Sequence, residues 1–550
     1  MVDRKAKIGR LAPALMLLSV IVMVVARATA SYFDFAVANI ITVICGLTFY
    51  VTALMLWLRV GRASRRLKTA VVFAPLGLIF VGLCFYEPLG LDSELVPRFR
   101  YRWGSDPLVQ AEKNKESVRE PESALSPSIS QGLDKSQGLN DYAGFLGSDR
   151  SATIKHASFS DPSSWTESTP QLLWKRKIGA GWSAFSVVGE VAVTLEQRDD
   201  YETLQAYALK TGEPLWKNEW KARHTTSLGG LGPRSTPVIA NGIVYAQGAN
   251  GYFIAAKLDS GEKVWDKSLL DCVGVELSQA ESEVAWGRSS SPLVVENKVI
   301  IPLGGAADKI ATLICFDAQT GEEKWRTGRE QVSYASPTLM NLQQTPQIVS
   351  VNNDTVSSHR LEDGAELWRT DWPGSSSGPA NVSQPVAVDD QRVLLSKAYG
   401  SGAKMLKVTG SSDGTWKVEE LWKNSSVLKT KFTNVVIHEG YAYGLSDGIL
   451  ECVDLGDGQR KWKSKRYRHG QIMLVGQHLL IVAEDGSVAI GVANPESFEE
   501  LYRFQAIEGM TWNNPALAGN LLLVRNGEQA ACYRLPMQSR TESVSVPAAE

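Results

Sequence analysis

Residues 206–217 read AYALKTGEPLWK, and similar stretches return down the 550-residue chain. The clearest copies are AAKLDSGEKVW (255–265), ICFDAQTGEEKW (314–325), SSHRLEDGAELW (357–368) and ECVDLGDGQRKW (451–462). In all five stretches a glycine precedes the tryptophan by four positions. Two looser copies, SSDGTWKVEELW (411–422) and VANPESFEELYR (492–503), fill the gaps. This spacing, mostly about 40 to 60 residues, indicates a repeat architecture.

Each copy predicts the same local structure. Alternation of apolar and polar residues before the turn is typical of a half-buried strand. A short polar residue followed by glycine reverses the chain, and a second strand then carries the aromatic residue. Another pair of strand-like runs lies upstream, as in residues 235–258. Four short strands per repeat form one blade of a β-propeller.

The number of aromatic positions predicts how many blades there are. The eight positions are Trp174, Trp216, Trp265, Trp325, Trp368, Trp422, Trp462 and Tyr502. Trp174 has no turn of its own before it, whereas residues 513–536 contain three strand-like runs and no closing aromatic strand. We therefore expect an all-β, eight-bladed propeller in which the N-terminal strand completes the last blade and removes an exposed edge.

The first part of the chain is different in kind. Residues 11–26, 36–58 and 69–86 are uncharged and mostly apolar, and each is close to the roughly 17 to 25 residues that a bilayer demands. We expect an α-helical transmembrane region over residues 1–102, with helices near 11–30, 36–58 and 69–88.

Basic residues predict the orientation of these helices. Arg59, Arg62, Arg65, Arg66 and Lys68 separate the second and third segments without an acidic residue, which favours a cytoplasmic loop. The later chain would then lie outside the cytoplasm, so we expect a multi-pass protein of the inner (cytoplasmic) membrane with a periplasmic propeller. Residues 28–30 (ATA) also resemble a signal-peptidase site, and cleavage there would leave two spans with the same final orientation.

The remaining boundaries follow from composition. Residues 103–140 are rich in Pro, Ser, Glu, Lys and Gln and predict a disordered linker. The propeller is then expected over 141–537, with a flexible tail over 538–550. A formal net charge of -2 gives no electrostatic reason to expect a nucleic-acid partner. The six cysteines form no C-x-x-C pair, and the six histidines have no ligand spacing, so no metal site is predicted.

The repeated A-x-D-x-x-T-G-x-x-x-W pattern resembles the tryptophan-docking repeat of the PQQ-like (quinoprotein and BamB-type) β-propeller family. The resemblance covers about residues 171–536. The preceding DYAGFLGSDRSATI (141–154) resembles the lead-in of bacterial PQQ-like propeller proteins. The motif is specific for the fold and weaker for function, because the tryptophans are structural in enzymes and non-enzymes alike.

Candidate binding residues lie just before the first strand of each blade, where a propeller gathers them around a central funnel. Aromatic, basic and amide side chains at these positions could bind a planar or anionic ligand. They could equally satisfy strand ends around a water-filled channel. The candidates are Trp182, Arg234, Trp286, Arg288, Tyr334, Gln384, Asn434, His469, Gln471, Trp512 and Asn513.

Two classes of function remain open. The resemblance implies either a membrane-tethered binding or scaffolding module with a protein partner in the envelope, or a dehydrogenase that uses PQQ with Ca²⁺ and passes electrons to the membrane quinone pool. Quinoprotein enzymes need a catalytic Asp and Ca²⁺ ligands, and many have adjacent cysteines. The blade-start positions hold no Asp or Glu, and no cysteines are adjacent. The sequence favours the binding module, with no catalytic or metal residues assigned.

Overall fold

The computed structural model describes residues 2–30, 35–60, 63–103, 141–165, 169–226, 228–305, 310–376, 378–412 and 414–538. The chain divides into two compact units, with the division after residue 120. Apart from residues 103 and 538, the expected linker and tail lie outside the described residues.

The first unit contains three long helices, α1 (Val2–Thr29), α2 (Phe35–Val60) and α3 (Arg65–Phe85). Each contains a stretch long and apolar enough to cross a membrane. The third helix begins at Arg65 because the Ser64 side chain caps it, accepting a hydrogen bond from the Leu67 amide at 3.3 Å.

A short hairpin follows α3. Residues 86–88, which we expected to be helical, belong to β1 (Tyr86–Leu91), which pairs with β2 (Pro97–Tyr101). The apolar run that predicted the helix extends to Tyr86. Pro88 cannot donate the backbone hydrogen bond that a helix requires, so the helix ends earlier. Asn39 of α2 donates to the backbone oxygen of Glu94 at 2.7 Å and so connects the hairpin loop to the helices.

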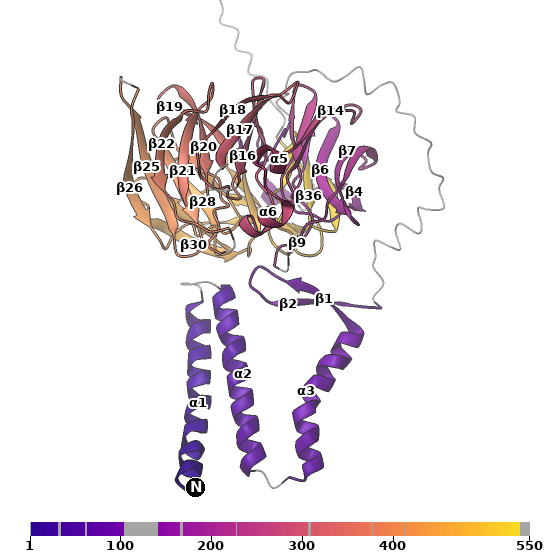
Figure 1. Cartoon of the computed structure of the whole chain (residues 1–550), viewed down its shortest axis with the longest axis vertical. Helices are drawn as coiled ribbons and strands as arrows, with labels where there is room; N and C mark the ends of the chain where they lie inside the picture. Colours follow the sequence, from indigo (N-terminus) through magenta and orange to yellow (C-terminus); the bar gives the residue numbers. More distant parts are fainter. Residues whose placement is uncertain are drawn as a thin grey trace, which may run out of the picture. The chain divides into compact units, whose positions relative to one another are not determined.

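The second unit consists mainly of four-stranded antiparallel sheets, which Figure 1 shows as successive groups of arrows. The first four sheets, numbered here in chain order from sheet 1 to sheet 4, are β5 (Ser186–Val188), β6 (Val191–Arg198), β7 (Tyr201–Ala208) and β8 (Pro214–Lys221); β11 (Val238–Ala240), β12 (Ile243–Gln247), β13 (Tyr252–Lys257) and β14 (Lys263–Ser268); β15 (Leu293–Val295), β16 (Lys298–Gly304), β17 (Ala311–Asp317) and β18 (Glu323–Thr327); and β19 (Thr338–Leu342), β20 (Thr345–Val351), β21 (Thr355–Arg360) and β22 (Glu366–Asp371).

Four further sheets follow in the same unit. Sheets 5 to 8 are β23 (Val386–Ala387), β24 (Arg392–Lys397), β25 (Gly402–Gly410) and β26 (Trp416–Asn424); β27 (Val435–His438), β28 (Tyr441–Ser446), β29 (Ile449–Asp454) and β30 (Arg460–Arg466); β31 (Gln471–Val475), β32 (His478–Val482), β33 (Ser487–Val492) and β34 (Glu500–Gln505); and β35 (Ala516–Ala518), β36 (Leu521–Arg525), β37 (Gln529–Arg534) and β4 (Gln171–Lys177).

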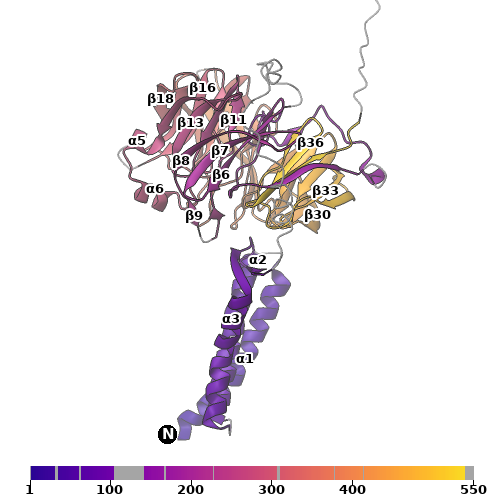
Figure 2. The ribbon, with the colours of Figure 1, turned by 90° about the vertical axis from the view of Figure 1, so that its right-hand side faces the viewer.

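The last sheet is completed by the first strand of the unit. β4 pairs antiparallel with β37, and Trp174 lies opposite Cys532. The predicted sharing of one sheet by both ends of the unit is therefore confirmed. β35 of this sheet also lies against β5, so sheet 8 is a neighbour of sheet 1. In Figure 2, β36 and β18 lie on opposite sides of the unit.

The repeated tryptophans join neighbouring sheets. The indole of Trp216 donates a hydrogen bond to the backbone oxygen of Leu258 in sheet 2 at 2.8 Å. A Cβ atom on the turn glycine Gly261 would come within 2.7 Å of the same indole. The four-residue spacing from glycine to tryptophan therefore has two causes, because the glycine supplies a positive φ for its own turn and makes room for the tryptophan of the preceding sheet. Equivalent glycine–tryptophan contacts join Gly212 to Trp174, Gly321 to Trp265, Gly364 to Trp325 and Gly458 to Trp422.

The pattern changes between sheets 4 and 5. The Trp368 indole donates within its own sheet, to Gln347 Oε1 at 2.8 Å. The hairpin of β25 and β26 is longer than the others and has no equivalent turn to receive the indole. Instead β26 packs against β22, and Trp372 lies 5.1 and 5.3 Å from the ammonium groups of Lys397 and Lys404. At this junction, cation–π contacts thus replace the contact between a tryptophan and the glycine turn of the next sheet.

The segment before β4, residues 141–165, crosses the first strands of several sheets. Tyr142 pairs with Val187 of sheet 1, and the backbone oxygen of Ala143 accepts from Ile239 of sheet 2. Arg150 donates to the backbone oxygens of Ser291, Pro292 and Pro337 in sheets 3 and 4. β3 (Thr153–Ile154) pairs in parallel with β31 of sheet 7. After the short helix η1 (Pro162–Ser164), Trp165 packs on Tyr502. This lead-in segment therefore connects sheets that lie far apart in the sequence.

Candidate functional site

Four aromatic rings from different connections meet beside the first strands of the sheets. The rings of Trp182 and Trp512 have centroids 4.8 Å apart with their planes inclined by 35°. Phe432 lies 4.9 Å from Trp512 and 5.4 Å from His469. Because Trp182 and Trp512 are in contact, no planar ligand fits between them. Three of the predicted residues are thus brought together, and Phe432, which the sequence did not single out, joins two of them.

A small hairpin extends this aromatic cluster. It consists of β9 (Thr225–Thr226) and β10 (Gly230–Leu231), and the backbone oxygen of Gly229 accepts from Trp182 Nε1 at 2.5 Å and from Arg234 Nη2 at 2.9 Å. A Cβ atom on Gly229 would lie 2.5 Å from Arg234 and 2.9 Å from Trp286. Any larger residue here would have to displace the Arg234 guanidinium and the Trp286 ring, so the close approach of Gly229 links Trp182, Arg234 and Trp286.

Tyr334 continues the same wall. Its hydroxyl accepts a hydrogen bond from the Trp286 amide at 3.1 Å and donates to the backbone oxygen of Ser376 at 2.5 Å. Burial raises the pKa of Tyr334, so the phenol remains protonated and serves as a fixed connection between two loops. Six predicted residues therefore belong to one continuous wall, namely Trp182, Arg234, Trp286, Tyr334, His469 and Trp512.

The two predicted arginines already hold protein oxygens. Arg234 donates to the backbone oxygens of Gly229 and Gly232, and Arg288 donates to that of Leu303 at 2.8 Å. Burial lowers the pKa of each arginine to about 10, which leaves both charged at neutral pH. An anionic ligand would have to compete with these carbonyl groups for the guanidinium N–H donors.

The predicted amides connect adjacent sheets. Gln384 Oε1 accepts from the Ser336 amide at 3.0 Å, and Asn434 Oδ1 accepts from the Gln384 amide at 2.9 Å. Gln471 donates to the backbone oxygen of Trp512, and Asn513 donates to that of Ser183, both at 2.8 Å. These four candidates therefore have a structural role as links between first strands.

The same linkage runs through sheets 1 to 4 with hydroxyl groups as acceptors. The backbone amide of Ala184 donates to Thr236 Oγ1 at 3.0 Å, and that of Thr236 donates to Ser291 Oγ at 2.9 Å. The backbone amide of Ser291 in turn donates to Ser336 Oγ at 2.8 Å. Each link fixes the separation of two neighbouring first strands. Thr236 and Ser291 could not be singled out from the sequence, because a serine or threonine before a strand carries no distinctive signal.

Several polar atoms beside the aromatic cluster have no hydrogen-bond partner among the described residues. They are Trp512 Nε1, His469 Nδ1, Gln471 Oε1 and Asn513 Oδ1. The pKa of His469 lies well below its usual value because of burial and the nearby charges of Lys431, Arg466 and Arg468. His469 is therefore neutral at physiological pH. The cluster can offer hydrogen bonds to a neutral group, but it offers no charged acid for proton transfer.

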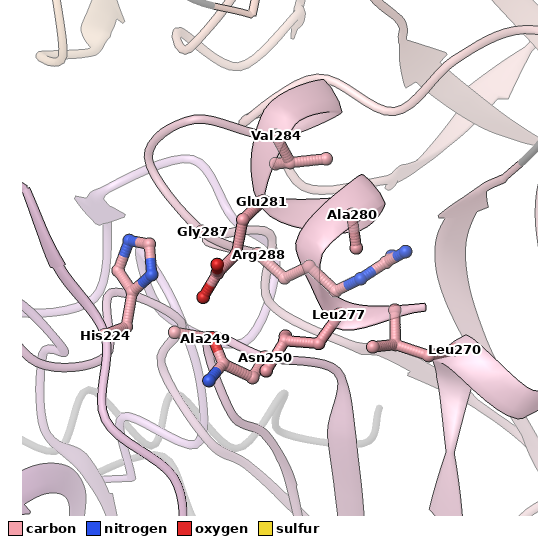
Figure 3. A pocket seen from close by; sticks show the side chains of 10 residues that line it. All are labelled: His224, Ala249, Asn250, Leu270, Leu277, Ala280, Glu281, Val284, Gly287 and Arg288. Atoms are coloured by element: carbon pink, nitrogen blue, oxygen red, sulfur yellow. The ribbon is translucent and has the colours of Figure 1, made fainter. Parts of the chain in front are cut away.

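A separate pocket lies under two short helices, α5 (Leu269–Val273) and α6 (Leu277–Glu283). Figure 3 shows Glu281 and His224 directed toward this pocket. The pocket has a volume of about 240 Å³, counting the solvent at its open mouth. Burial, followed by the charge of Arg234, lowers the pKa of His224 to about 4. A Cβ atom on Gly287 would meet His224 Nε2 at 2.8 Å, so the histidine is held against the backbone. No motif in the sequence predicts this pocket.

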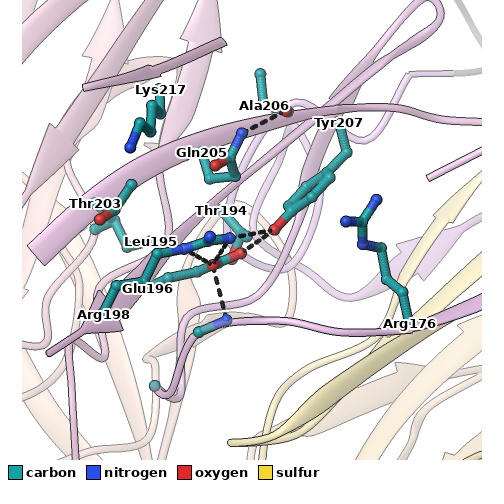
Figure 4. A network of polar contacts seen from close by, with 12 residues as sticks. Arg176, Thr194, Leu195, Glu196, Arg198, Thr203, Gln205, Ala206, Tyr207 and Lys217 are labelled. Atoms are coloured by element: carbon teal, nitrogen blue, oxygen red, sulfur yellow. Dashed lines mark hydrogen bonds and ion pairs between the residues drawn. The ribbon is translucent and has the colours of Figure 1, made fainter. Parts of the chain in front are cut away.

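Two buried carboxylates also have structural partners. Glu196 accepts from the Gly179 amide at 2.8 Å, from Arg198 Nη2 at 2.8 Å and from Tyr207 at 2.6 Å, as Figure 4 shows. Glu202 accepts from Trp220 Nε1 at 2.9 Å and from the Ala249 amide at 3.0 Å, and burial raises its pKa. Both carboxylates are occupied in holding strands and loops together.

The donor set suits a quinone cofactor with Ca²⁺ poorly. Asn434 Oδ1 is used by the Gln384 amide, and the Arg288 side chain is bound to backbone oxygens. Within the described ranges, no group of three or more His, Cys, Asp and Glu side chains is placed to hold a metal ion. Carboxylates do lie near Arg288, because Glu281 lines the same pocket and the charge of Glu283 partly offsets the effect of burial on the pKa of the guanidinium.

The family follows from comparison with known proteins. A family model described as "Outer membrane protein assembly factor BamB" matches residues 161–301 and 201–464, which together span more than half of the chain. The chain belongs to this PQQ-like repeat family. The resemblance inferred from the Gly–Trp repeats is confirmed. Among curated proteins, no significant sequence match was found.

Solved structures show the fold of this PQQ-like repeat protein. A europium-containing methanol dehydrogenase aligns with a TM-score of 0.54 at 11% identity, over 72% of this chain and 98% of that chain. A quinohemoprotein alcohol dehydrogenase from Comamonas testosteroni aligns with a TM-score of 0.55 at 12% identity, over 78% and 85% of the two chains. At such identities the likeness concerns the propeller-like fold alone.

Proposed function

We propose that this PQQ-like repeat protein is a membrane-anchored, extracytoplasmic propeller that acts as a binding or scaffolding module in the cell envelope. Its eight sheets form eight blades, and β4 closes the circle by completing the last one. The three apolar helices make it a multi-pass protein of the inner membrane with the propeller on the periplasmic side. A protein in the envelope is its expected partner.

Closure is supported by contacts on both sides of the shared sheet. β35 of sheet 8 lies against β5 of sheet 1, and β5 lies against β11 of sheet 2. Arg525 of sheet 8 also reaches sheet 1, where it donates to Thr194 Oγ1 at 2.5 Å and to the Leu195 backbone oxygen at 3.1 Å. Full closure leaves no sheet edge between the first and last blades.

One observation carries the preference for binding over catalysis. The amide side chains of the predicted site join neighbouring sheets, as in the links from Ser336 to Gln384 and from Gln384 to Asn434. A general base must be able to reach a substrate proton, and Glu196 and Glu202 are buried among their partners. The aromatic wall, in contrast, offers a ligand apolar rings and a few polar atoms without a partner among the described residues, such as Trp512 Nε1 and His469 Nδ1.

The opposing candidate is a PQQ-dependent dehydrogenase that passes electrons to the membrane quinone pool. The dehydrogenase structures with this fold and the apolar helices motivate it. The purified full-length protein, titrated with PQQ and Ca²⁺, distinguishes the two functions. We expect neither stoichiometric quinone absorbance nor reduction of an electron-accepting dye. Saturable binding with turnover would refute the binding-module proposal.

Partner and topology need separate measurements. Proximity labelling from the intact membrane protein should recover an envelope protein reproducibly, and labelling no different from that of an unrelated membrane protein would count against a scaffold. Single cysteines placed after residue 141 should react with a membrane-impermeant thiol reagent from the periplasmic side. Reaction only after the inner membrane is opened would reverse the proposed orientation.

A further inference from the structure

The outer strand of sheet 6 carries an unusual charge. β30 has the sequence RKWKSKR, with five basic residues and no acidic one, for a formal charge of +5. The outer strands β8, β14, β18, β22, β26 and β34 mix both signs and range from -1 to +1. β4 holds three basic residues. Lysines on an edge strand can serve only to prevent edge-to-edge aggregation, but in that case every outer strand should carry a similar charge.

The geometry of β30 leaves one edge open. In the part of the chain that the structure describes, β30 is the last strand of its sheet and hydrogen-bonds only to β29. Its pairing with β29 is irregular at two places, on either side of the pairs of Cys452 with Trp462 and of Glu451 with Lys463, so its lysines do not all share one face. An open edge with unpaired backbone groups can accept a further strand.

Part of the charge is neutralised within the protein. The buried Glu451 carboxylate lies 2.8 Å from Arg460 Nε and 3.9 Å from Lys463 Nζ. Lys465 pairs with Glu500 at 3.4 Å, but its side chain remains 56% exposed. Lys461 is also exposed and lies over the Tyr441 ring at 6.0 Å. Lys461 and Lys465 thus present positive charge at both ends of the strand.

We propose that β30 is a docking edge for an acidic, extended polypeptide segment, which would add as a further strand to sheet 6. The partner's backbone would supply hydrogen bonds, and its carboxylates would pair with the exposed Lys461 and Lys465. Cross-strand pairs of opposite charge favour such an arrangement, and like charges disfavour it. Basic residues that follow one strand edge match an extended acidic chain better than they match a flat lipid surface. The proposal deepens the proposed binding function and rests on it.

Fluorescence anisotropy with the full-length protein in detergent tests this docking edge. The probe is a labelled seven-residue peptide that alternates Glu and Val, compared with a peptide that alternates Lys and Val. A third peptide keeps the glutamates but replaces every valine by proline, so that its backbone cannot pair. We expect saturable binding of the first peptide alone, weakened by salt. Equal binding of the proline peptide would reduce the interaction to charge attraction and overturn strand addition.

Variants locate the site. Lys461→Glu with Lys465→Glu should weaken binding of the acidic peptide by about tenfold or more, because two attractive pairs become repulsive. Lys461→Gln with Lys465→Gln should weaken it by a smaller factor. The matched control is Lys417→Glu with Lys423→Glu on β26, which changes the same charge on two exposed lysines and should leave binding unchanged. Thermal unfolding should confirm that all three variants are folded.

Three outcomes would overturn the assignment. The first is that the acidic peptide shows no saturable binding. The second is an equal loss of peptide binding in the β30 and β26 variants, which would indicate general charge attraction. Binding of vesicles that contain anionic phospholipid, abolished by the β30 variant while peptide binding is not, would assign the row of charge to lipid. None of these results depends on PQQ, so failure here is distinguishable from dehydrogenase activity, which would instead refute the proposed function.

Discussion

Replacing Gly321 by alanine should destabilise the propeller unit through the tryptophan of the preceding sheet. Gly321 has φ +70°, and a Cβ atom there would lie 2.6 Å from Cδ2 and 2.8 Å from Cε3 of Trp265. The left-handed backbone costs a non-glycine residue about 1 to 2 kcal/mol. Displacement of a well-packed ring adds about 1 to 3 kcal/mol. We expect a total loss of roughly 2 to 5 kcal/mol in the free energy of unfolding.

Gly242→Ala is the matched control. Gly242 has φ +75°, but its added methyl group would meet nothing within 4 Å. It should therefore lose only the backbone contribution of about 1 to 2 kcal/mol. Urea unfolding followed by tryptophan fluorescence measures both values. A unit of roughly 400 residues loses about 1.2 °C in Tm per kcal/mol, so calorimetry is the less sensitive method. Equal losses for the two variants would refute the explanation of the Gly–Trp spacing by contact between sheets.

Three further predictions concern contacts described above. Trp216→Phe should cost about 1 kcal/mol more than Trp325→Phe in urea unfolding, because Trp216 Nε1 donates to the Leu258 oxygen at 2.8 Å, whereas Trp325 Nε1 is buried without a partner among the described residues. Arg525→Met should reduce the free energy of unfolding by about 1 to 3 kcal/mol, because its charged N–H groups are the donors for four oxygens of residues 179–195. A loss well below about 1 kcal/mol would show that water replaces these donors. The pKa of His224 is lowered to about 4 in the folded protein, so between pH 6.5 and pH 4 the unfolded chain binds more protons than the folded one. The stability that neutral His224 provides is complete above its ordinary pKa of 6.5 and should decline as pH falls toward 4. His224→Asn should show a shallower decline when urea unfolding is repeated across this pH range.

The sheets were predictable because their determinants are repeated locally. Glycine and tryptophan recur at one spacing, as in Gly261 and Trp265, and every turn interrupts an alternating pattern. The sharing of sheet 8 was also predictable, because Trp174 lacks a preceding turn and the C-terminal run lacks an outer strand. Both inferences compare segments within the sequence and need no knowledge of contacts in space.

The candidate site was predictable only in part. Positions before the first strands, such as Trp182 and Trp512, do converge, since the topology alone brings them together. Phe432 was missed because it lies two residues before Asn434 in an irregular connection. The linking roles of Gln384 and Asn434 could not be read from the sequence, because an amide that binds a ligand and one that binds a neighbouring strand look the same. The role of each amide depends on its hydrogen-bond partner, which belongs to the adjacent sheet.

The lead-in segment and β4 have a consequence for the order of synthesis. Thr153 and Trp174 leave the ribosome early, but their strand partners are Leu474 of sheet 7 and Cys532 of sheet 8. At about 5 to 20 residues per second, more than 350 further residues take roughly 20 to 70 s to translate. During that interval sheet 1 has no completed neighbour on one side, and its apolar flank is exposed to the surrounding solution. Chaperones that hold the nascent chain are therefore expected to matter more for this protein than for one whose first strands find partners at once.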